Sequence, residues 1–284
     1  MNELQSKLLE MMVDFDQFCR ENHLSYYMIG GTMLGAYRHK GFIPWDDDMD
    51  IGMLREDYER FLLLAKTKLK EPYVLRHQSV EPSVPYAFAH IENKNTTCIE
   101  HRRNKDSYAG GVYLEIFPLD GCSRNTLIQK MQANLVKLEK QMLYALILDK
   151  EQKKRSAWKN MVVCLMRRFS SIPQMTRCLD ETISHWTRTK SPCVCNLLGH
   201  WGIREHIPVQ DFLPAREYEF QGHLFFGPAN PKSYLTHLYG PDYMIPPSKE
   251  EQKSFLHPMY YMNLSLPYKE YEKRQKKRKR GENI

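Results

Sequence analysis

The sequence has no long apolar run. A membrane-spanning helix needs roughly 20 consecutive, mostly apolar residues, and no stretch of these 284 residues approaches that length. The start, MNELQSKLLEMMVDF, also lacks the basic segment and apolar run of a secretory signal. These absences argue against an integral membrane protein and predict a cytoplasmic one.

A disulfide framework is missing as well. The seven cysteines are odd in number and scattered, which favours reduced thiols. Cys193 and Cys195 stand close together, with His200 and His206 downstream. Only one residue separates the two cysteines, whereas zinc ligands are usually spaced by two to four residues. The spacing therefore favours free thiols over a zinc site.

The body of the chain has almost no net charge. Residues 273–280, KRQKKRKR, carry seven positive charges, which equals the net charge of +7 for the whole chain. A near-neutral body argues against a nucleic-acid-binding protein with a basic face. We expect residues 273–284 to be a disordered tail. It could also contact anionic lipid at the inner face of the membrane, where each Lys or Arg contributes about 1 kcal/mol.

Composition and periodicity are those of a globular protein with both helices and strands. Hydrophobic residues make up 42% and charged residues 26% of the chain, as is usual for soluble domains. No repeat or linker is visible, so we predict a single domain over residues 1–272, with a helical insertion at about 125–190. The spacing of apolar residues predicts helices over 3–22, 32–39, 55–70, 125–149, 157–169, 174–187 and 232–238, and strands over 25–29, 48–53, 73–77, 87–92, 96–101 and 111–118. Helix 157–169 could pack in the core or lie on a membrane surface.

Residues 28–54 concentrate the groups that suit phosphate chemistry. Gly30 and Gly31 end a short predicted strand, and Thr32 is a natural N-cap for the next helix. Glycines beside a helix N-terminus let the backbone approach a phosphate closely. Arg38 and Lys40 could neutralise further negative charge. This segment therefore predicts a phosphate-binding site.

Three acids follow at alternate positions, Asp46, Asp48 and Asp50. In a strand, Asp48 and Asp50 share one face, and Asp46 joins them if the strand begins earlier. Such acids repel one another unless a cation lies among them, and hard oxygen ligands favour Mg²⁺, Mn²⁺ or Ca²⁺ over zinc. A calcium loop of the EF-hand type would need Gly and Glu where Ile51 and Asp57 stand. The pattern thus favours another divalent-metal site.

A further acid, Glu115, lies inside the predicted strand 111–118. Alternation places Tyr113, Glu115 and Phe117 on one face of this strand. A lone carboxylate among apolar residues is costly to bury without a partner, and either a metal or an arginine would compensate. Asp48 and Asp50, completed by Glu115 from a neighbouring strand, would suit Mg²⁺.

The motifs also carry a family resemblance. Gly30-Gly31-Thr32 with Asp48-Met49-Asp50 resembles the nucleotidyltransferase signature, in which two acids on one strand and a third nearby hold metal. More closely, GGTMLGAYRHKGFIPWDDDMDIGMLREDYERF resembles the opening motif of the LicD family. The likeness continues at LEIFPLDG (residues 114–121) and YLTHLYGPDYMIPP (residues 234–247). Many relatives carry Asp where this chain has Glu115.

The resemblance implies a nucleotidyltransferase-like α+β fold, with a mixed β-sheet flanked by helices, and Mg²⁺ or Mn²⁺ as cofactor. LicD proteins typically move phosphocholine from CDP-choline to teichoic acid, lipopolysaccharide or capsule precursors, releasing CMP. Fukutin-related relatives use a CDP-ribitol donor, so an alditol phosphate (ribitol or glycerol phosphate) is the alternative. A non-catalytic glycan- or nucleotide-binding module is a third reading, against which the intact acids speak.

Site roles follow from the resemblance residue by residue. Asp48, Asp50 and Glu115 are the expected metal ligands, and Asp46 is the hypothetical base or a further ligand. Gly30, Gly31 and Thr32 would cradle phosphate, with Arg38 or Lys40 offsetting charge. An aromatic cage for choline could use Tyr26, Tyr27, Trp45 or Tyr243. The second matching block contains Tyr239, Gly240, Asp242, Tyr243 and Pro246 and is expected to form either part of the site or a structural turn, and His257 could also serve the site.

Overall fold

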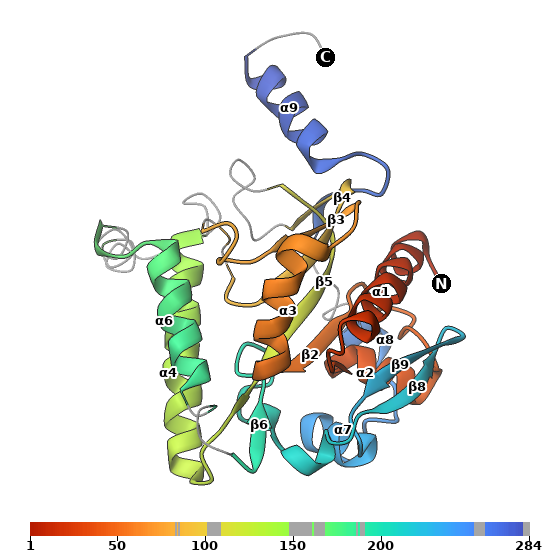
Figure 1. Cartoon of the computed structure of the whole chain (residues 1–284), viewed down its shortest axis with the longest axis vertical. Coiled ribbons are helices and arrows are strands. Elements are labelled where there is room, and N and C mark those ends of the chain that lie inside the picture. Colours follow the sequence, from red (N-terminus) through yellow and green to blue (C-terminus); the bar gives the residue numbers. More distant parts are fainter. Residues whose placement is uncertain are drawn as a thin grey trace.

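An eight-stranded mixed β-sheet occupies the centre of the computed structural model, with helices packed around it (Figure 1). The structure describes residues 1–82, 84, 86–100, 109–147, 161, 168–185, 187, 191–252 and 259–280. The sheet contains β1 (Tyr27–Met28), β2 (Asp50–Leu54), β3 (Tyr73–Arg76), β4 (Ala89–Glu100), β5 (Gly110–Gly121), β6 (Cys193–Cys195), β7 (His206–Pro208) and β10 (Met259–Asn263). A separate hairpin pairs β8 (Arg216–Phe220) with β9 (His223–Gly227).

The described helices lie on the faces and at the ends of this sheet. They are α1 (Glu3–Glu21), α2 (Gly30–His39), α3 (Arg55–Lys68), α4 (Thr126–Ile147), α6 (Ile172–Ser184), α7 (Pro231–Tyr239), α8 (Lys249–Gln252) and α9 (Tyr268–Lys279), with short 3-10 turns η1 (Gly202–Glu205) and η2 (Val209–Asp211). None of the helices in the described part of the chain is both long and apolar enough to cross a membrane.

Strand order explains how distant segments meet. The main path runs β1-β2-β5-β4-β10, with β3 also on β4, β6 on the end of β5, and β7 on β6. β2 and β5 run parallel, whereas the other pairings formed by described residues are antiparallel. The prediction of an α+β fold with a mixed sheet is therefore confirmed. Strand β5 touches β2, β4 and β6, which makes it the central connection of the sheet.

Helix α1 confirms the prediction for residues 3–22. A capping box fixes its start: Asn2 accepts from the Gln5 backbone N–H, and the Gln5 side chain accepts from the Asn2 N–H. Its apolar stripe is buried, and the Phe15 and Phe18 rings meet Phe61 of α3 edge to face. Gln5 Nε2 also donates to the Asp46 carbonyl at 2.9 Å. The helix therefore anchors the acidic loop as well as the core.

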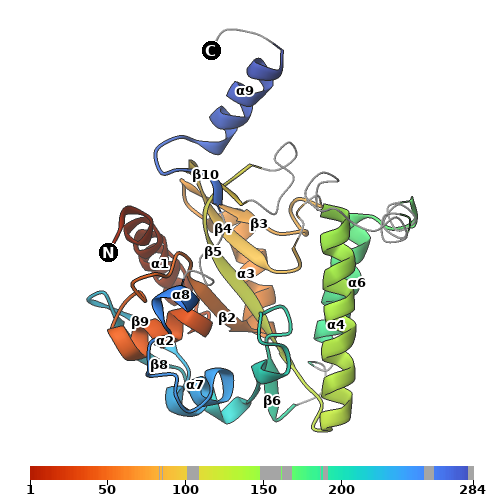
Figure 2. The ribbon, with the colours of Figure 1, turned by 180° about the vertical axis from the view of Figure 1, so that it is seen from behind.

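The middle of the chain is helical, as the periodicity predicts. Helices α4 and α6 lie side by side at one edge of the molecule (Figures 1 and 2). Arg55 joins them to the sheet, because its guanidinium binds both carboxylate oxygens of Asp120 in β5 and reaches Asp180 in α6. Most of the helix predicted over 157–169 lies outside the described residues. The extents of the domain and of its insertion stay predictions.

Two strand predictions merge in the structure. Residues 87–92 and 96–101 are not separate strands, because β4 runs unbroken from Ala89 to Glu100 with a register irregularity against β5 between Asn93 and Cys98. A bulge of this kind interrupts pairing without ending the strand, so the local polar residues imitate a turn in the sequence.

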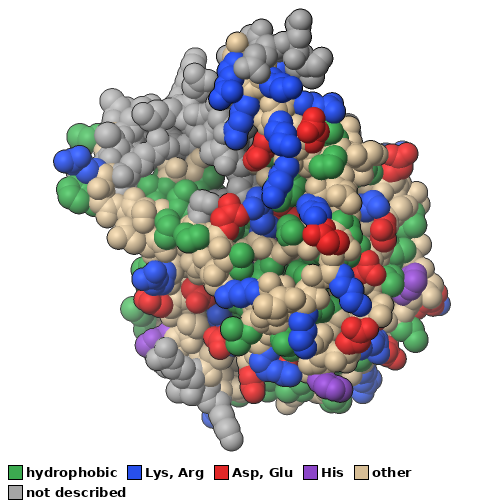
Figure 3. Space-filling view, turned by 45° about the horizontal axis from the view of Figure 1, so that its top comes forward, with side chains coloured by type: hydrophobic (Ala, Val, Ile, Leu, Met, Phe, Trp, Pro, Cys, Tyr) green, Lys and Arg blue, Asp and Glu red, His purple; other side chains and the backbone are tan. Residues whose placement is uncertain are grey.

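The basic end of the chain differs from the expected disordered tail. Residues up to 279 form helix α9, which projects from the sheet end near β10 (Figures 1 and 2). Tyr268 and Tyr271 pack with Ile99 and Ala109, and the Lys, Arg, Gln and Glu residues that follow are good helix formers. Basic side chains gather at the top of the molecule, where this helix lies (Figure 3). Residues 281–284 lie outside the described part.

The prediction of reduced thiols is wrong for two cysteines. Cys122 and Cys193 form a disulfide with a Cα–Cα distance of 5.7 Å. The pairing follows from strand register: Asp120 lies opposite Cys195 and Gly121 opposite Val194, so Cys122 meets Cys193. Among the described residues, the free cysteines are Cys19, Cys98, Cys178 and Cys195.

Candidate active site

The parallel pairing of β2 with β5 brings two predicted site acids together. Asp50, the first residue of β2, lies directly across from Glu115 in β5. Their side chains share the face that alternation in β5 assigns to Tyr113 and Glu115. The structure therefore places a carboxylate of the DMD motif beside the acid that comes from a separate part of the sequence.

The alternating pattern predicts that Asp48, and Asp46 if the strand begins earlier, belong to the strand, but β2 begins only at Asp50. Both lie in the loop before β2, together with Asp47, and one carboxylate oxygen from each of the three lies within 4.8 Å of the others. The loop follows Pro44, and the Gln5 amide holds the Asp46 carbonyl. The acids thus converge by a turn of the chain rather than by strand alternation, and the turn includes an acid that the sequence pattern omits.

The electrostatics of Asp50 show how close these acids lie. Burial, then the charges of Asp48, Glu115 and Asp46, raise the pKa of Asp50 well above its usual range. Like charges in a poorly solvated place oppose ionisation unless a cation is present. Several carboxylates with hard oxygen donors suit Mg²⁺ or Mn²⁺. The donor set therefore fits the divalent metal that the resemblance implies.

The two glycines bring the start of α2 against these carboxylates. A Cβ atom on Gly30 would lie 3.0 Å from Asp50 Oδ2, and one on Gly31 would lie 3.0 Å from Asp46 Oδ2. Gly30 also has a φ of +55°, which favours glycine. A side chain at either position would crowd the acids, so the helix N-terminus can adjoin the cluster only with glycine there.

Thr32 has a different role from the N-cap that its sequence position predicts. Helix α2 begins two residues earlier, at Gly30, with Ile29 at the cap position. The left-handed conformation of Gly30 allows this early start. Thr32 lies within the first turn, and its hydroxyl accepts the backbone N–H of Asp50 at 2.8 Å. It therefore fixes β2 to α2 where the acids begin.

The two predicted cations have different surroundings, and Arg38 lies against the second matching block of residues 234–247. Arg38 donates to the Tyr243 carbonyl at 2.7 Å, and burial lowers the pKa of its guanidinium. Lys40 ends α2 in a left-handed conformation, and its Nζ lies 3.0 Å from Glu219 of β8, with 71% of its side chain exposed. A lysine engaged with the hairpin is not part of the acidic site as the structure stands.

The predicted aromatic cage is wrong for two of its members. Tyr26 and Tyr27 are fully buried. The Tyr26 hydroxyl donates to Asp16 at 2.6 Å, and the Tyr27 ring packs against Phe212. Tyr27 in β1 and Tyr26 directly before this strand both lie in the core, so neither can line an open ligand site. Trp45 is half-buried against the core.

The second matching block, residues 234–247, does reach the site. Tyr239, at the end of α7, has its hydroxyl 3.9 Å from the position of a Cβ on Gly30, and Tyr243 receives the bond from Arg38. Gly240, with φ +94°, ends α7, whereas Asp242 and Pro246 are exposed. The turn thus contributes its two tyrosines to the region, while His257 lies outside the described residues.

His90 is a site neighbour that the sequence reading missed. It lies opposite Glu115 in the β4–β5 register, and its Nε2 is 3.3 Å from Glu115 Oε1. The imidazole is fully buried and stacked between the rings of Tyr86 and Tyr113. The alternation in β4 places His90 on a definite face, but only the register shows which acid it meets. His90 is placed to fix the position of the Glu115 carboxylate.

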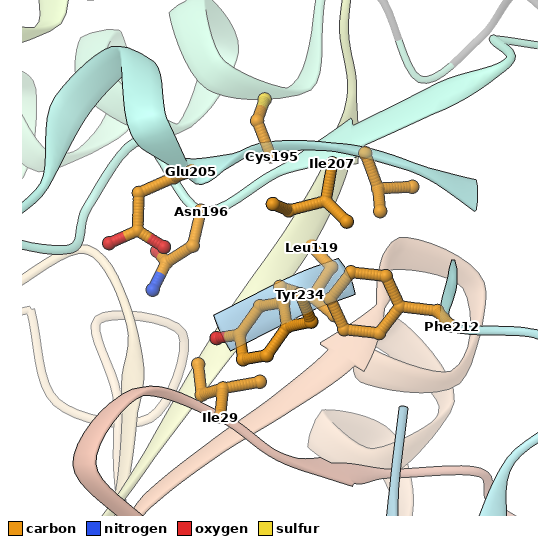
Figure 4. A pocket seen from close by; sticks show the side chains of 9 residues that line it. Ile29, Leu119, Cys195, Asn196, Glu205, Ile207, Phe212 and Tyr234 are labelled. Atoms are coloured by element: carbon orange, nitrogen blue, oxygen red, sulfur yellow. The ribbon is translucent and has the colours of Figure 1, made fainter. Parts of the chain in front are cut away.

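Tyr234 and Glu205 were also missed, and both lie behind the glycines. The Gly30 N–H donates to the Tyr234 hydroxyl at 2.9 Å. Tyr234 and Glu205 line a narrow cavity together with apolar side chains such as Ile29 and Leu119 (Figure 4). Burial raises the pKa of Glu205 to about 7, against the opposing charge of Lys140. These residues support the start of α2 from the side away from solvent. Tyr234 begins the matching block of residues 234–247, whereas no local motif marks Glu205.

Comparisons with known proteins agree with this geometry. The model of the family described as LicD/FKTN/FKRP, nucleotidyltransferase domain, matches residues 23–142, which include the glycines, the acids and β5. The chain is 26% identical over 258 residues to the lipopolysaccharide cholinephosphotransferase LicD of Haemophilus influenzae, covering 89% of this chain and 94% of that protein.

Two mammalian proteins match over shorter stretches. The ribitol-5-phosphate transferase FKTN of Mus musculus is 33% identical over 63 residues, which is 22% of this chain and 14% of that protein. The ribitol 5-phosphate transferase FKRP of the same species is 53% identical over 32 residues, 11% of this chain and 6% of that protein. The family model and the near full-length relative both match around the paired strands that carry Asp50 and Glu115, so the chain is similar to the LicD family at its candidate site and to LicD over most of its length.

Proposed function

We propose that this protein transfers a phospho-substituent, phosphocholine from CDP-choline in the first instance, to a hydroxyl of a cell-surface glycan precursor. The broader class, a transferase of phosphorus-containing groups, is supported by the similarity to the LicD family. The observation that carries the proposal is the register of β2 and β5, which sets Asp50 beside Glu115 directly under the glycine-lined start of α2. Carboxylates for a metal and backbone for a phosphate thus adjoin one another.

Asp48, Asp50 and Glu115 would hold Mg²⁺ or Mn²⁺. When bound, this ion neutralises the pyrophosphate of the donor and the charge that develops on departing CMP. Gly30 and Gly31 let a donor phosphate approach the backbone at the helix N-terminus, and Arg38 supplies positive charge from the side of Tyr239 and Tyr243. Thr32 and His90 keep the Asp50 backbone and the Glu115 carboxylate in place.

Asp46 is the proposed base. Its Oδ2 lies against Gly31 at the start of α2, next to the place where a donor phosphate would enter. In the reaction the acceptor oxygen attacks the phosphorus of the phosphocholine group, and the bond from that phosphorus to CMP breaks. The proton of the acceptor hydroxyl passes to Asp46, and CMP leaves with the electron pair of the broken bond.

Ribitol or glycerol phosphate is the second candidate group. A choline headgroup calls for an aromatic cage, and the burial of Tyr26, Tyr27 and Tyr243 leaves the half-buried Trp45 and the exposed Tyr37, whose ring packs against that of Tyr243, as candidates. The relatives FKTN and FKRP are ribitol phosphate transferases by name. The remaining aromatic side chains do not decide between CDP-choline and a CDP-linked alditol, so the test compares these donors directly.

A donor panel decides between these readings. Purified protein with Mg²⁺ is incubated with CDP-choline, CDP-ribitol or CDP-glycerol, with and without candidate glycan acceptors, and CMP release is measured. We expect acceptor-dependent CMP release that is fastest with CDP-choline and is lost on chelation of Mg²⁺. The variant Asp48→Ala should lose this release. The variant Glu56→Gln, which changes an exposed acid of α3, is the control and should keep it. No release from any donor would contradict the proposed function, and release from CDP-ribitol alone would select the alternative.

We also propose a cytoplasmic location with peripheral contact between α9 and anionic membrane. Lys273, Arg274, Lys276, Lys277 and Arg278 are exposed on this helix, and each would contribute about 1 kcal/mol near an anionic surface. Co-sedimentation with vesicles containing phosphatidylserine should decrease when residues 273–284 are deleted, and added salt should weaken the binding of the full chain. Equal binding of both chains would contradict the contact.

A further inference from the structure

A second group of metal-ligand side chains lies at the far end of β5, away from the acids. Cys122 follows β5, Cys195 ends β6 and His206 begins β7. One ligand atom of each lies within 4.8 Å of the others, and all three residues are buried. Thiolate sulfur and imidazole nitrogen are the ligands that zinc prefers in structural sites. The cluster therefore has both the chemistry and the closeness of a zinc site.

Strand pairing explains why these residues converge. Cys195 lies directly across from His206 in the antiparallel β6–β7 pair, so their side chains share a face. Cys193 and Cys195, two residues apart on β6, share that face as well. On the other side of β6, the Cys122 N–H donates to the Cys193 carbonyl. Three strands thus deliver their side chains to one place, which the spacing of cysteines along a single segment cannot show.

The imidazole of His206 supplies an independent indication. His206 is 7% exposed, and its Nδ1 bonds the Ile203 carbonyl at 3.0 Å. That bond fixes the proton on Nδ1 and leaves a lone pair on Nε2, the usual arrangement for a metal-bound histidine. Within the described part of the chain, Nε2 is buried and has no hydrogen-bond partner. Leaving a buried polar atom unpaired destabilises the folded state, and a cation bound to Nε2 would remove that cost.

Cys195 is among the residues that line the cavity beside Tyr234, but this cavity does not explain why Cys122, Cys195 and His206 lie close together. In Figure 4 the Cys195 sulfur points away from the apolar side chains of Ile207 and Leu119 that line the cavity. A buried cysteine can be simply a small apolar residue, but that reading does not explain an unpaired imidazole nitrogen beside two sulfur atoms. The Cys122 sulfur is bonded to that of Cys193 in the structure, so zinc binding requires this pair in its reduced form.

We propose that Cys122, Cys195 and His206, with Cys193 as the fourth ligand, bind one structural zinc ion when the cysteines are reduced. The ion fixes the β6–β7 pair to the end of β5. Because η1 with Glu205 leads directly into β7, the ion also holds the segment that lies behind Tyr234 and Gly30. The site is separate from the acidic cluster and does not depend on which donor the enzyme uses.

Metal content of the full-length protein tests the site. The chain is purified under reducing conditions, loaded with zinc, freed of excess metal and analysed by mass spectrometry. We expect about one zinc ion per chain, and at least a tenfold decrease in retained zinc in Cys195→Ser and His206→Gln. Cys178→Ser, an exposed free cysteine, and Asp48→Asn, in the acidic loop, should keep the zinc of the unaltered chain.

Cobalt provides a readout that does not depend on how well the variants fold. Cobalt bound to the unaltered reduced chain should show thiolate-to-metal charge-transfer absorption and the intense visible bands of tetrahedral coordination. Oxidation with diamide, which is reduced as it converts the Cys122 and Cys193 thiols to the disulfide, should remove the bands of the tetrahedral site because two of its four ligands are then no longer thiolates. Absence of both zinc and these bands from the reduced chain would overturn the proposal. Zinc that is kept by His206→Gln but lost from Asp48→Asn would overturn it too, because the acids would then be the ligands.

Discussion

The two polar clusters along β5 are assembled in opposite ways. In the middle of the strand, Glu115 meets acids that are nearly all supplied by one short loop and the start of β2. At its end, Cys122 meets residues from two later strands. The acids repel one another and raise the pKa of Asp50, whereas sulfur and imidazole ligands are uncharged without metal. Repulsion among the acids is expected to lower the free energy of unfolding, whereas zinc bound at the second cluster is expected to raise it.

The largest effect should come from neutralising the central acid. Asp50→Asn keeps the size of the side chain and removes its charge, so turnover should fall on the order of 10³-fold, the scale expected when a group that stabilises the transition state is lost. The melting temperature should not fall, because a buried repulsion is removed. CMP release and thermal unfolding measure the two quantities. Unchanged turnover, or a clear loss of stability, would contradict this view of the acidic cluster.

The next effect concerns the ion pair that lies between the clusters. Arg55→Ala leaves Asp120 buried without its guanidinium, at a cost of about 3–5 kcal/mol in the free energy of unfolding. Arg60→Ala removes an exposed pair with Asp57 and should cost under about 1 kcal/mol. Urea unfolding measures both variants. Equal costs would mean that burial of the Arg55 pair has little weight.

Removal of zinc should have a slightly smaller effect on stability. Chelation of the reduced protein releases a link between β5 and the β6–β7 pair, which closes a loop like that of the Cys122–Cys193 disulfide. Loop closure of this kind contributes about 3–4 kcal/mol, so the free energy of unfolding should fall by roughly that amount. Hydrogen exchange should quicken in β6 and β7 but not in β1. Stability that does not respond to chelation would break the contrast between the clusters.

The smallest effect concerns the pH dependence of stability that comes from a core histidine, His77, outside both clusters. Burial lowers the pKa of His77 from 6.5 to about 4, so the unfolded chain takes up a proton first as the pH falls. The contribution of neutral His77 is complete above pH 6.5 and is lost between pH 6.5 and 4, by up to about 3 kcal/mol. His77→Asn should flatten the stability curve in this window, and the exposed His223→Gln should not. Curves of equal slope would contradict the assignment.

Local chemistry let the sequence predict much of the acidic site. Gly30, Gly31 and the alternating acids lie within one segment, and the isolated charge of Glu115 stands out in an apolar strand. What the sequence could not show was the loop conformation of Asp46 and Asp48, because alternation looks the same in a loop and in a strand. Thr32 misled for a related reason, since the φ of Gly30 decides where the helix begins.

Residues that meet through strand register were beyond reach. His90 and Glu205 have no motif around them, and the motif that begins at Tyr234 does not show that its hydroxyl meets Gly30. The closeness of all three to the site depends on contacts between distant segments. Cys193 and Cys195 likewise have an unfavourable zinc spacing along the chain, whereas strand pairing sets Cys195 directly across from His206. Tyr26 and Tyr27 failed as cage residues because the sequence shows their aromatic character but not that both side chains are buried around the short strand β1.

The parallel pairing of β2 with β5 has a consequence for how the enzyme comes into being. Helix α3 and strands β3 and β4 lie between β2 and β5 in the sequence. Pairing β2 with β5 closes this long connection, and the entropy lost in doing so makes a non-local parallel pair slow to form. A growing or partly folded chain therefore carries Asp50 without Glu115 beside it. Catalytic activity should therefore appear late in folding, after β2 has paired with β5. A partly folded chain should have little activity on its donor.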